Sequence, residues 1–255
     1  MTRFSGKVAL ISAAGAGIGR ATAMIIGREG GAVVGVDVEP AVLERLTADL
    51  TAAGGRALGV KADALDASSV ERAVRQAVDA YGRIDILVNA VGGSTVIPRP
   101  AATLDELSLE DWQKLLHFNL TGTFLFTHAV IPIMKRQQSG KIVNLSSIAG
   151  RGLVQTSSSA YATAKGGIIA LTRKLAFELG PHGITVNAIA PSLTLSDRMR
   201  PHWERRSPEA QAAEIRRTPL GRVATPEDQA RVICFLASSD ADFVTGVTID
   251  VTGGQ

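Results

Sequence analysis

Cysteine is nearly absent from this chain. Its 255 residues include a single cysteine, Cys234, and four histidines. One thiol can form neither an internal disulfide nor a cysteine-based zinc site, so nothing in the composition asks for an oxidising compartment, and we expect a cytoplasmic protein. The histidines lack the H-x-x-x-H spacing of metal ligands, so we expect no catalytic metal. Cys234 lies on an apolar helical stripe and is interpreted as a core residue.

Long apolar runs and a strong charge of one sign are also missing. No apolar run approaches the ~20 residues that span a bilayer, and residues 1–6 carry no signal-peptide cleavage site. The 27 basic and 24 acidic residues leave a net charge of only +3, while 45% of the residues are hydrophobic. This composition excludes intrinsic disorder, and we expect neither a membrane nor a nucleic acid among the partners.

What the sequence does contain is a regular alternation of short apolar runs and amphipathic stretches. The apolar runs lack polar alternation, which is typical of parallel strands buried on both faces. They predict strands over 7–12, 32–37, 56–61, 84–89, 141–145, 184–189 and 248–250. Apolar residues at helical spacing predict helices over 17–28, 40–53, 67–81, 109–135, 160–179 and 225–237. The fold class is therefore α/β, a single domain over 1–255 with a doubly wound (Rossmann) parallel sheet of about seven strands and helices on both faces.

Two segments interrupt this alternation. Residues 92–103 are irregular, and residues 194–222 contain only one short helical stretch, at 208–216. Both follow predicted strands, where open α/β sheets bind ligands, so we interpret 194–222 as a substrate lid. Trp203 in this lid either closes over a substrate or packs on a neighbouring helix.

The predicted lid also holds the whole excess of positive charge. It contains seven arginines, no lysine and four acidic residues, which leaves the rest of the chain neutral. Arginine suits bidentate recognition of carboxylate or phosphate, so an anionic substrate or carrier is one hypothesis. The alternative is a solvated lid whose charges pair with one another.

A glycine-rich turn follows the first predicted strand. Residues 12–19 read Ser-Ala-Ala-Gly-Ala-Gly-Ile-Gly and lead straight into a helix. Such a turn lets the backbone approach a pyrophosphate at the helix N-terminus. Asp37 ends the second strand, where its carboxylate would accept hydrogen bonds from ribose hydroxyls and repel a 2′-phosphate, which favours NAD as the cofactor. A helix-capping role for Asp37 is the alternative.

A second group of residues suggests proton transfer. Tyr161 and Lys165 are four residues apart on a predicted helix and so share one face. An ammonium group beside a phenol favours the phenolate and lowers its pKa. Ser146 and Ser147 end the preceding strand at the same edge of the sheet, where a hydroxyl can hold a substrate oxygen beside that phenol.

Together these motifs resemble the short-chain dehydrogenase/reductase family over nearly the whole chain. The resemblance implies that Tyr161 is the acid/base, that Ser147 orients the substrate, that Lys165 binds the nicotinamide ribose and lowers the pKa of the tyrosine, and that Asn119 holds a water. The implied catalytic set is Asn119, Ser147, Tyr161 and Lys165. The implied cofactor-binding set is Ser12, Gly15, Gly17, Ile18, Gly19, Asp37, Asp63, Ala64, Asn89, Tyr161, Lys165, Pro191, Thr194 and Ser196.

Three positions depart from the family pattern. Ala13 and Ser192 stand where the family has glycine, and Ala90 stands where it has a second asparagine. All three are small, so the backbone path is expected to survive at a cost of about 1 kcal/mol wherever a positive φ is needed. We expect weaker cofactor binding at most.

The resemblance implies an NAD(H)-dependent oxidoreductase that interconverts a secondary alcohol and its ketone. One alternative is a 3-oxoacyl thioester reductase, whose acidic carrier protein or coenzyme A would suit the lid arginines. The other is a catalytically silent NAD-binding sensor, suggested by the three departures. The substrate pocket is expected between 93–103, 151–159 and the lid. The helices bearing Asn119 and Tyr161 form the usual subunit interface of the family, which implies a homotetramer or dimer.

Overall fold

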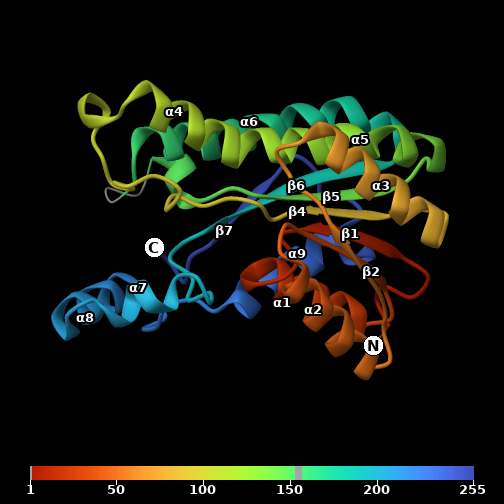
Figure 1. The fold of residues 1–255 in the computed structure, drawn as a ribbon, viewed down its shortest axis with the longest axis horizontal. Coiled ribbons are helices and arrows are strands. Elements are labelled where there is room, and N and C mark those ends of the chain that lie inside the picture. Colours follow the sequence, from red (N-terminus) through yellow and green to blue (C-terminus); the bar gives the residue numbers. More distant parts are fainter. Residues whose placement is uncertain (1, 153–156) are drawn as a thin grey trace.

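Seven parallel strands form one sheet in the computed structural model, which describes residues 2–152 and 157–255 (Figure 1). The strand order is β3-β2-β1-β4-β5-β6-β7, so the direction of winding reverses between β1 and β4. This is the doubly wound arrangement that the sequence predicts, and ligands bind at such a reversal. The strands are β1 (Val8–Ser12), β2 (Ala32–Asp37), β3 (Arg56–Lys61), β4 (Ile86–Asn89), β5 (Gly140–Leu145), β6 (Ile184–Pro191) and β7 (Thr248–Val251).

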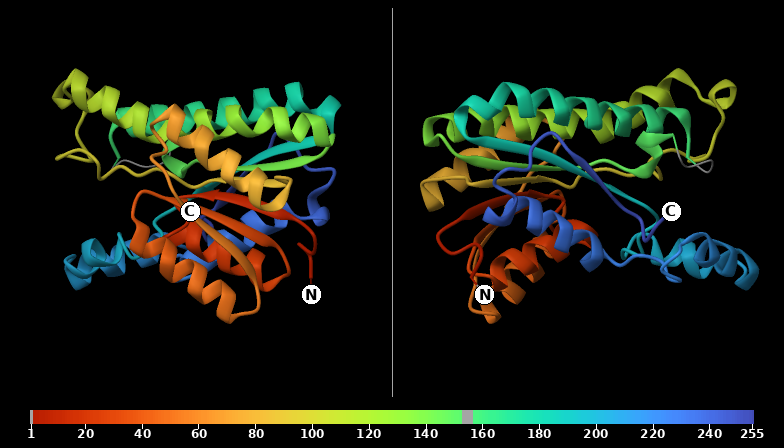
Figure 2. Two further views of the ribbon diagram at one scale, coloured as in Figure 1. Left: turned by 45° about the vertical axis from the view of Figure 1, so that its right-hand side comes forward. Right: turned by 180° about the vertical axis from the view of Figure 1, so that it is seen from behind.

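Helices cover both faces of this sheet (Figures 1 and 2). One face carries α1 (Gly17–Arg28), α2 (Pro40–Ala52) and α9 (Pro226–Ala237), and the other carries α3 (Ala67–Tyr81), α4 (Leu109–Leu116), α5 (Gly122–Gln137) and α6 (Ser159–Leu179). The short helices α7 (Arg200–Glu204) and α8 (Pro208–Arg217) lie beyond the carboxyl edge of the sheet. None of the helices in the described ranges is long and apolar enough to cross a membrane.

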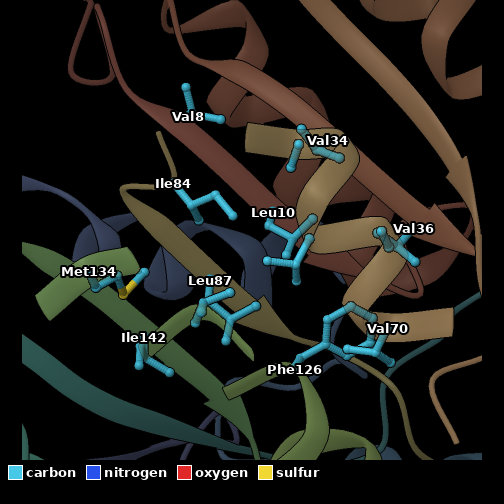
Figure 3. Packing of buried hydrophobic residues seen from close by; sticks show 14 of the residues in the cluster. Val8, Leu10, Val34, Val36, Val70, Ile84, Leu87, Phe126, Met134 and Ile142 are labelled. Atoms are coloured by element: carbon cyan, nitrogen blue, oxygen red, sulfur yellow. The ribbon is translucent and has the colours of Figure 1, made fainter. Parts of the chain in front are cut away.

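Alternate residues of each strand serve opposite layers of the core. Leu10 and Val34 belong to one buried cluster with Val70 of α3 and with Phe126 and Met134 of α5 (Figure 3). The intervening residues of the same strands belong to a second cluster that includes α1, α2 and α9. Burial of each large apolar side chain contributes about 1.5–3 kcal/mol, so apolar runs without polar alternation are what such a sheet requires.

Cys234 lies in the second cluster and is fully buried, which confirms its interpretation as a core residue. Burial raises the pKa of its thiol to about 12. The thiolate is the reactive form of cysteine, so this side chain is chemically inert near neutral pH.

The predicted helix over 109–135 is wrong in one respect, because a π-helical turn at His117–Thr121 separates α4 from α5. The cause lies outside the helix. The Asn119 side chain donates to the Gly93 carbonyl at 3.0 Å and accepts from the Gly93 N–H at 2.8 Å. A tertiary contact of this kind leaves no trace in the hydrophobic spacing, which continues unbroken through the turn.

The lid follows the prediction at 208–216, where α8 forms, but it contains a second helix. The five residues of α7 are too short to give a periodic signal. Ser207 caps α8 by accepting the Ala210 N–H at 3.2 Å, and Pro208 occupies the first turn, where a missing N–H costs nothing. The two ends of the lid are tied together by a bridge between Thr194 and Ala224.

Candidate active site

A cleft of about 770 Å³ opens at the carboxyl edge of the sheet, lined by the segments that follow β1 to β6. It has a glycine-turn end, formed by residues 13–19 and Asp37, and a lid end, formed by Ser147, Tyr161, Arg198, Arg206 and Glu214. The predicted site residues found in its lining are Ser12, Gly17, Ile18, Gly19, Asp37, Asp63, Ala64, Ser147, Tyr161, Lys165, Pro191, Thr194 and Ser196. Within the described ranges, the other three (Gly15, Asn89 and Asn119) lie behind the lining.

The glycine turn leaves the start of α1 facing the cleft. Ala16 is the N-cap residue, and its methyl group cannot accept a hydrogen bond from the first helical turn. Gly17 has a φ of +55°, and a Cβ there would lie 3.2 Å from the Cβ of Ser196, which crosses over the turn from the lid. Free amide donors and the helix dipole at this point suit an anion.

Ala13 adopts a left-handed conformation, with a φ of +49°. The sequence predicts that the backbone path of the turn survives where the family has glycine, at a cost of about 1 kcal/mol for an alanine with positive φ. In the structure Ala13 takes that strained conformation. The departure at Ala13 therefore costs stability without closing the cleft.

The Asp37 carboxylate faces the cleft at the end of β2. One oxygen accepts the Gly15 N–H at 3.1 Å and the other accepts the Glu39 N–H at 3.3 Å. Glu39, and not Asp37, is the N-cap residue of α2, so the capping alternative for Asp37 is wrong. An acidic group beside a turn of amide donors fits a dinucleotide that presents ribose hydroxyls, and it opposes one that presents a phosphate there.

Two groups of hydrogen-bonded polar residues lie beneath the cleft. Ser12 accepts the Ala90 N–H at 3.0 Å, so the small residue at position 90 is held through its backbone. The Asn89 amide donates to Asn144 at 2.8 Å and to Thr127 at 3.0 Å, and Asn144 donates in turn to Thr172. These buried bonds fix the ends of β4 and β5 relative to α5 and α6. Asn89 therefore supports the floor of the cleft from behind.

Tyr161 and Lys165 enter the cleft from the first turns of α6. Ser158 caps this helix by accepting the Tyr161 N–H at 3.3 Å, which fixes where the helix begins and therefore where Tyr161 lies on it. The Ser147 hydroxyl lies beside Tyr161 and lowers the pKa of its phenol. Lys165 is buried, and its Nζ donates to the Leu145 carbonyl at 2.8 Å. The ammonium nitrogen lies 5.8 Å from the centre of the Tyr161 ring.

The two serines at the end of β5 have different partners. Ser146 is buried and donates to the Lys165 carbonyl at 2.8 Å, so its hydroxyl holds α6 against the strand. Ser147 lies beside Tyr161 in the cleft lining, and its Oγ accepts the Ala149 N–H at 3.1 Å. Both serines line the cleft, but the Ser146 hydroxyl is committed to α6, and the role of Ser147 toward a substrate stays a prediction.

The electrostatics of this cluster involve a residue from the lid. Burial raises the pKa of Tyr161, whereas the hydrogen bond with Ser147 and the positive charge of Arg198 lower it. Burial and the charge of Arg198 lower the pKa of Lys165 to about 7. Arg198 therefore adds a positive charge that opposes the effect of burial on the phenol, beside Lys165, for which the family resemblance implies the same role.

Gly92 and Gly93 join these groups. A Cβ on Gly92 would lie 2.7 Å from Lys165 Nζ and 2.8 Å from Asn119 Oδ1. Arg198 Nη2 donates to the Gly92 carbonyl at 3.0 Å, and a Cβ on Gly93 would lie 2.6 Å from both terminal nitrogens of Arg198. The sequence places Gly92 in a turn that the family resemblance puts along the cofactor and Gly93 in the expected pocket segment 93–103, but it predicts none of these contacts. Two consecutive glycines after a strand are the only signal that side chains approach there.

The Asn119 side chain is committed to the backbone. Besides its two bonds with Gly93, it donates to the Leu115 carbonyl at 3.0 Å. Its amide therefore shapes the π turn and the Gly93 loop. The predicted role in holding a water stays a prediction.

Other lid and loop residues have partners away from the reacting groups. Trp203 packs against Arg206, whose guanidinium carbon lies 5.7 Å from the centre of the indole ring. The Trp203 carbonyl accepts a hydrogen bond from the Gln211 side-chain amide. Arg151 pairs with Asp250 at 3.1 Å. The predicted pocket segment 151–159 includes residues 153–156, which lie outside the described residues.

Comparisons with known proteins agree over nearly the full length. A family model described as "Enoyl-(Acyl carrier protein) reductase" matches residues 12–255. The chain is 39% identical to (2S)-[(R)-hydroxy(phenyl)methyl]succinyl-CoA dehydrogenase subunit BbsD of Thauera aromatica and 39% identical to cyclohexanol dehydrogenase of a Rhodococcus species, in each case over 98% of this chain and 96% of the relative. It is 36% identical to 3-oxoacyl-[acyl-carrier-protein] reductase FabG of Thermotoga maritima, over 99% of this chain and 98% of that one.

Solved structures show the same likeness. One of them is a 3-oxoacyl-[acyl-carrier protein] reductase with bound NAD from Brucella melitensis, with a TM-score of 0.87 and 34% sequence identity. The match covers 99% of this chain and 93% of that chain.

Proposed function

This chain belongs to the short-chain dehydrogenase/reductase family, and from that premise we propose that it is an NAD(H)-dependent oxidoreductase that interconverts a secondary alcohol and its ketone, with Tyr161 as the acid/base. The observation that carries this proposal is the cluster at the lid end of the cleft. There Tyr161 lies beside Ser147 and next to the buried Lys165, on the wall of a cleft whose other end suits a dinucleotide.

The residues divide the chemistry between them. When bound, the dinucleotide supplies or accepts a hydride at its nicotinamide ring. In oxidation the Tyr161 phenolate removes the hydroxyl proton of the alcohol, and in reduction the phenol returns a proton to the carbonyl oxygen. The Ser147 hydroxyl holds the same oxygen. Lys165 is held by Leu145, close to Tyr161, where it contributes positive charge when protonated.

Asp37 supports NAD rather than NADP as the proposed cofactor. Its carboxylate faces the cleft beside the glycine turn, where a 2′-phosphate would meet like charge. The proposal assigns Ser12, Gly17, Ile18, Gly19, Asp63, Ala64, Pro191, Thr194 and Ser196 to the same cofactor, because they line one continuous cleft with Asp37. Gly15 and Asn89 act behind the lining, the first by fixing Asp37 and the second by supporting the floor.

A second candidate is a 3-oxoacyl thioester reductase. Two observations favour it: the relative from Thermotoga maritima carries that name, and the lid has an excess of arginine. An acidic carrier protein or coenzyme A would suit that surface. The silent-sensor alternative has less support, because the four catalytic positions are occupied by the residue types that the family resemblance implies.

The proposal also covers the domain organisation, the oligomeric state and the location of the protein. We place residues 194–222 as a lid on one dinucleotide-binding and catalytic unit, and we infer a homotetramer or dimer from the family. A cytoplasmic location rests on the single cysteine.

A substrate panel tests the assignment. The purified protein is assayed for consumption of NADH and of NADPH with cyclohexanone, acetoacetyl-coenzyme A and a sugar ketone. We expect turnover with at least one ketone and a preference for NADH. Turnover with the thioester alone would select the second candidate. No turnover with any of them, together with tight NADH binding in a fluorescence titration, would select the sensor.

A further inference from the structure

The lid end of the cleft carries positive charge without matching acids. Of the seven lid arginines, the described ranges give a carboxylate within 4.0 Å only to Arg206, paired with Glu214 at 3.6 Å, and to Arg222, paired with Asp228 at 2.6 Å. Residues 153–156, outside those ranges, contain no acid. Three of the seven, Arg198, Arg206 and Arg217, line the cleft, and Arg198 is the one that meets the catalytic cluster.

Arg198 extends from the lid to the Gly92–Gly93 loop, which borders the catalytic residues. Its guanidinium lies against Gly92 and Gly93, and it donates one N–H to the Gly92 carbonyl at 3.0 Å. Lys165 Nζ approaches the same glycine. The guanidinium and the Lys165 amine therefore meet at one residue, where an anion is attracted to Arg198 and, when the lysine is protonated, to both. A guanidinium has five N–H donors, so most of those on Arg198 remain for a ligand.

Arg200 and Arg206 differ from Arg198 in their position or in their partners. Arg200 lies two residues further on, in α7, and is exposed outside the cleft lining. Arg206 is already engaged by Glu214 and by the Trp203 ring. Removal of charge at position 200 changes the general field of the lid, whereas removal at position 198 also takes away the donors beside Tyr161.

We propose that Arg198 binds a carboxylate of the substrate, so that the protein acts on hydroxy acids and the matching oxo acids. This inference rests on the proposed function, because it places the acid group relative to the carbon that Tyr161 serves. The planar fork of the guanidinium matches the two oxygens of a carboxylate, which orients the substrate as well as attracting it. A monodentate cation at this position would attract without orienting.

The test is a ratio of rates within matched substrate pairs. At saturating NADH, kcat/KM is measured for acetoacetate against acetoacetamide and for levulinate against its amide. The two pairs differ in the distance between the carboxylate and the carbonyl. Wild type is expected to prefer the acid of at least one pair. In Arg198→Met the preference should fall roughly 10- to 100-fold, the range expected for a charge-assisted hydrogen bond in a cleft open to solvent.

Two further variants separate the carboxylate role from a structural one. Arg198→Lys keeps the charge but not the fork, and it should restore part of the preference. Arg200→Met removes one charge from the same lid and should leave the ratio within about twofold of wild type. An unchanged ratio in Arg198→Met would overturn the proposal. An equal fall in Arg200→Met would also overturn it, because the general field would then be the cause.

NADH binding by fluorescence titration completes the experiment. If Arg198→Met weakens NADH binding as much as it lowers the acid preference, the side chain serves the cofactor and the proposal fails. If wild type reduces neutral ketones with no preference for acids, this inference fails while the proposed function stands. If wild type reduces no ketone, the proposed function fails first.

Discussion

The walls at the two ends of the cleft differ, because one is formed mainly by backbone and the other mainly by side chains. At the glycine-turn end the wall is backbone: Gly17 packs against Ser196, Ala13 takes a positive φ, and Asp37 is fixed by the Gly15 N–H. At the lid end the wall is formed by long side chains, among them the exposed Arg198. A backbone wall has one shape, whereas a side-chain wall is altered by a single substitution. The first end therefore suits a fixed cofactor, and the second suits a substrate that differs between relatives.

Substitution of the proposed acid/base, at the lid end, should have the largest effect. In Tyr161→Phe the proton donor is lost while the cleft keeps its shape, so kcat should fall at least ~100-fold and the affinity for NADH should stay within about twofold. Steady-state assays and a fluorescence titration measure the two quantities. Tyr81→Phe is the matched control, because Tyr81 ends α3 away from the cleft. Retention of more than a few per cent of the rate would remove Tyr161 from the mechanism.

The next largest effect should be confined to the glycine-turn end. Asp37→Ala removes hydrogen bonds of a carboxylate to the ribose and the repulsion of a 2′-phosphate, so the preference for NADH over NADPH should fall roughly 10- to 100-fold. The ratio of kcat/KM for the two cofactors measures it. Glu39→Ala, an acid two residues away, should leave the ratio unchanged. An unaltered ratio in Asp37→Ala would mean that the carboxylate does not meet the ribose.

A smaller effect is expected from the charge at the lid end. Arg198 lowers the pKa of Tyr161 and of Lys165, so its loss raises both. Because oxidation needs the phenolate, activity is lost as the pH falls through the pKa of Tyr161, and in Arg198→Met this loss should begin at higher pH, by about 0.5–1 unit. The profile of kcat against pH with cyclohexanol measures the shift. A shift to lower pH, or an equal shift in Arg200→Met, would contradict the assigned direction.

The smallest effect concerns the backbone of the glycine turn. Ala13→Gly removes the cost of a positive φ and should stabilise the fold by about 1 kcal/mol, or roughly 2–4 °C in Tm. Gln138 is a second residue with a positive φ, at the end of α5, and Gln138→Gly serves as a control for cofactor binding. Ala13→Gly should bind NADH at least as tightly as wild type, whereas Gln138→Gly should not change the affinity. A lower Tm in Ala13→Gly would show that the methyl group itself packs.

The same contrast explains what could be read from the sequence. The strands and most helices can be predicted from local sequence patterns. The glycine-turn end of the cleft can be predicted too, because it needs glycine and aspartate at fixed spacing. Ser147, Tyr161 and Lys165 are legible because they lie on two adjacent elements. These residues lie in the cleft lining.

The features that local patterns miss all depend on contacts between distant segments. The π turn at Asn119 exists because its side chain binds Gly93, and the position of Arg198 depends on the carbonyl of Gly92, 106 residues earlier. The five-residue helix α7 is held in a lid whose periodic signal is too short to detect. Neither spacing nor composition records such contacts, so charge in the lid could be counted from the sequence but not assigned to the cleft.

Hydride placement tests the central claim most directly. In the proposed mechanism Ser147 and Tyr161 hold the carbonyl oxygen, so the hydride should reach the carbon that bears it. 2-Cyclohexen-1-one offers both a carbonyl and a carbon–carbon double bond to NADH deuterated at C4, and the product is examined by NMR. The account predicts an allylic alcohol with deuterium on the carbinol carbon, absent in Tyr161→Phe. Deuterium on the carbon remote from the oxygen, in a saturated ketone, would contradict it.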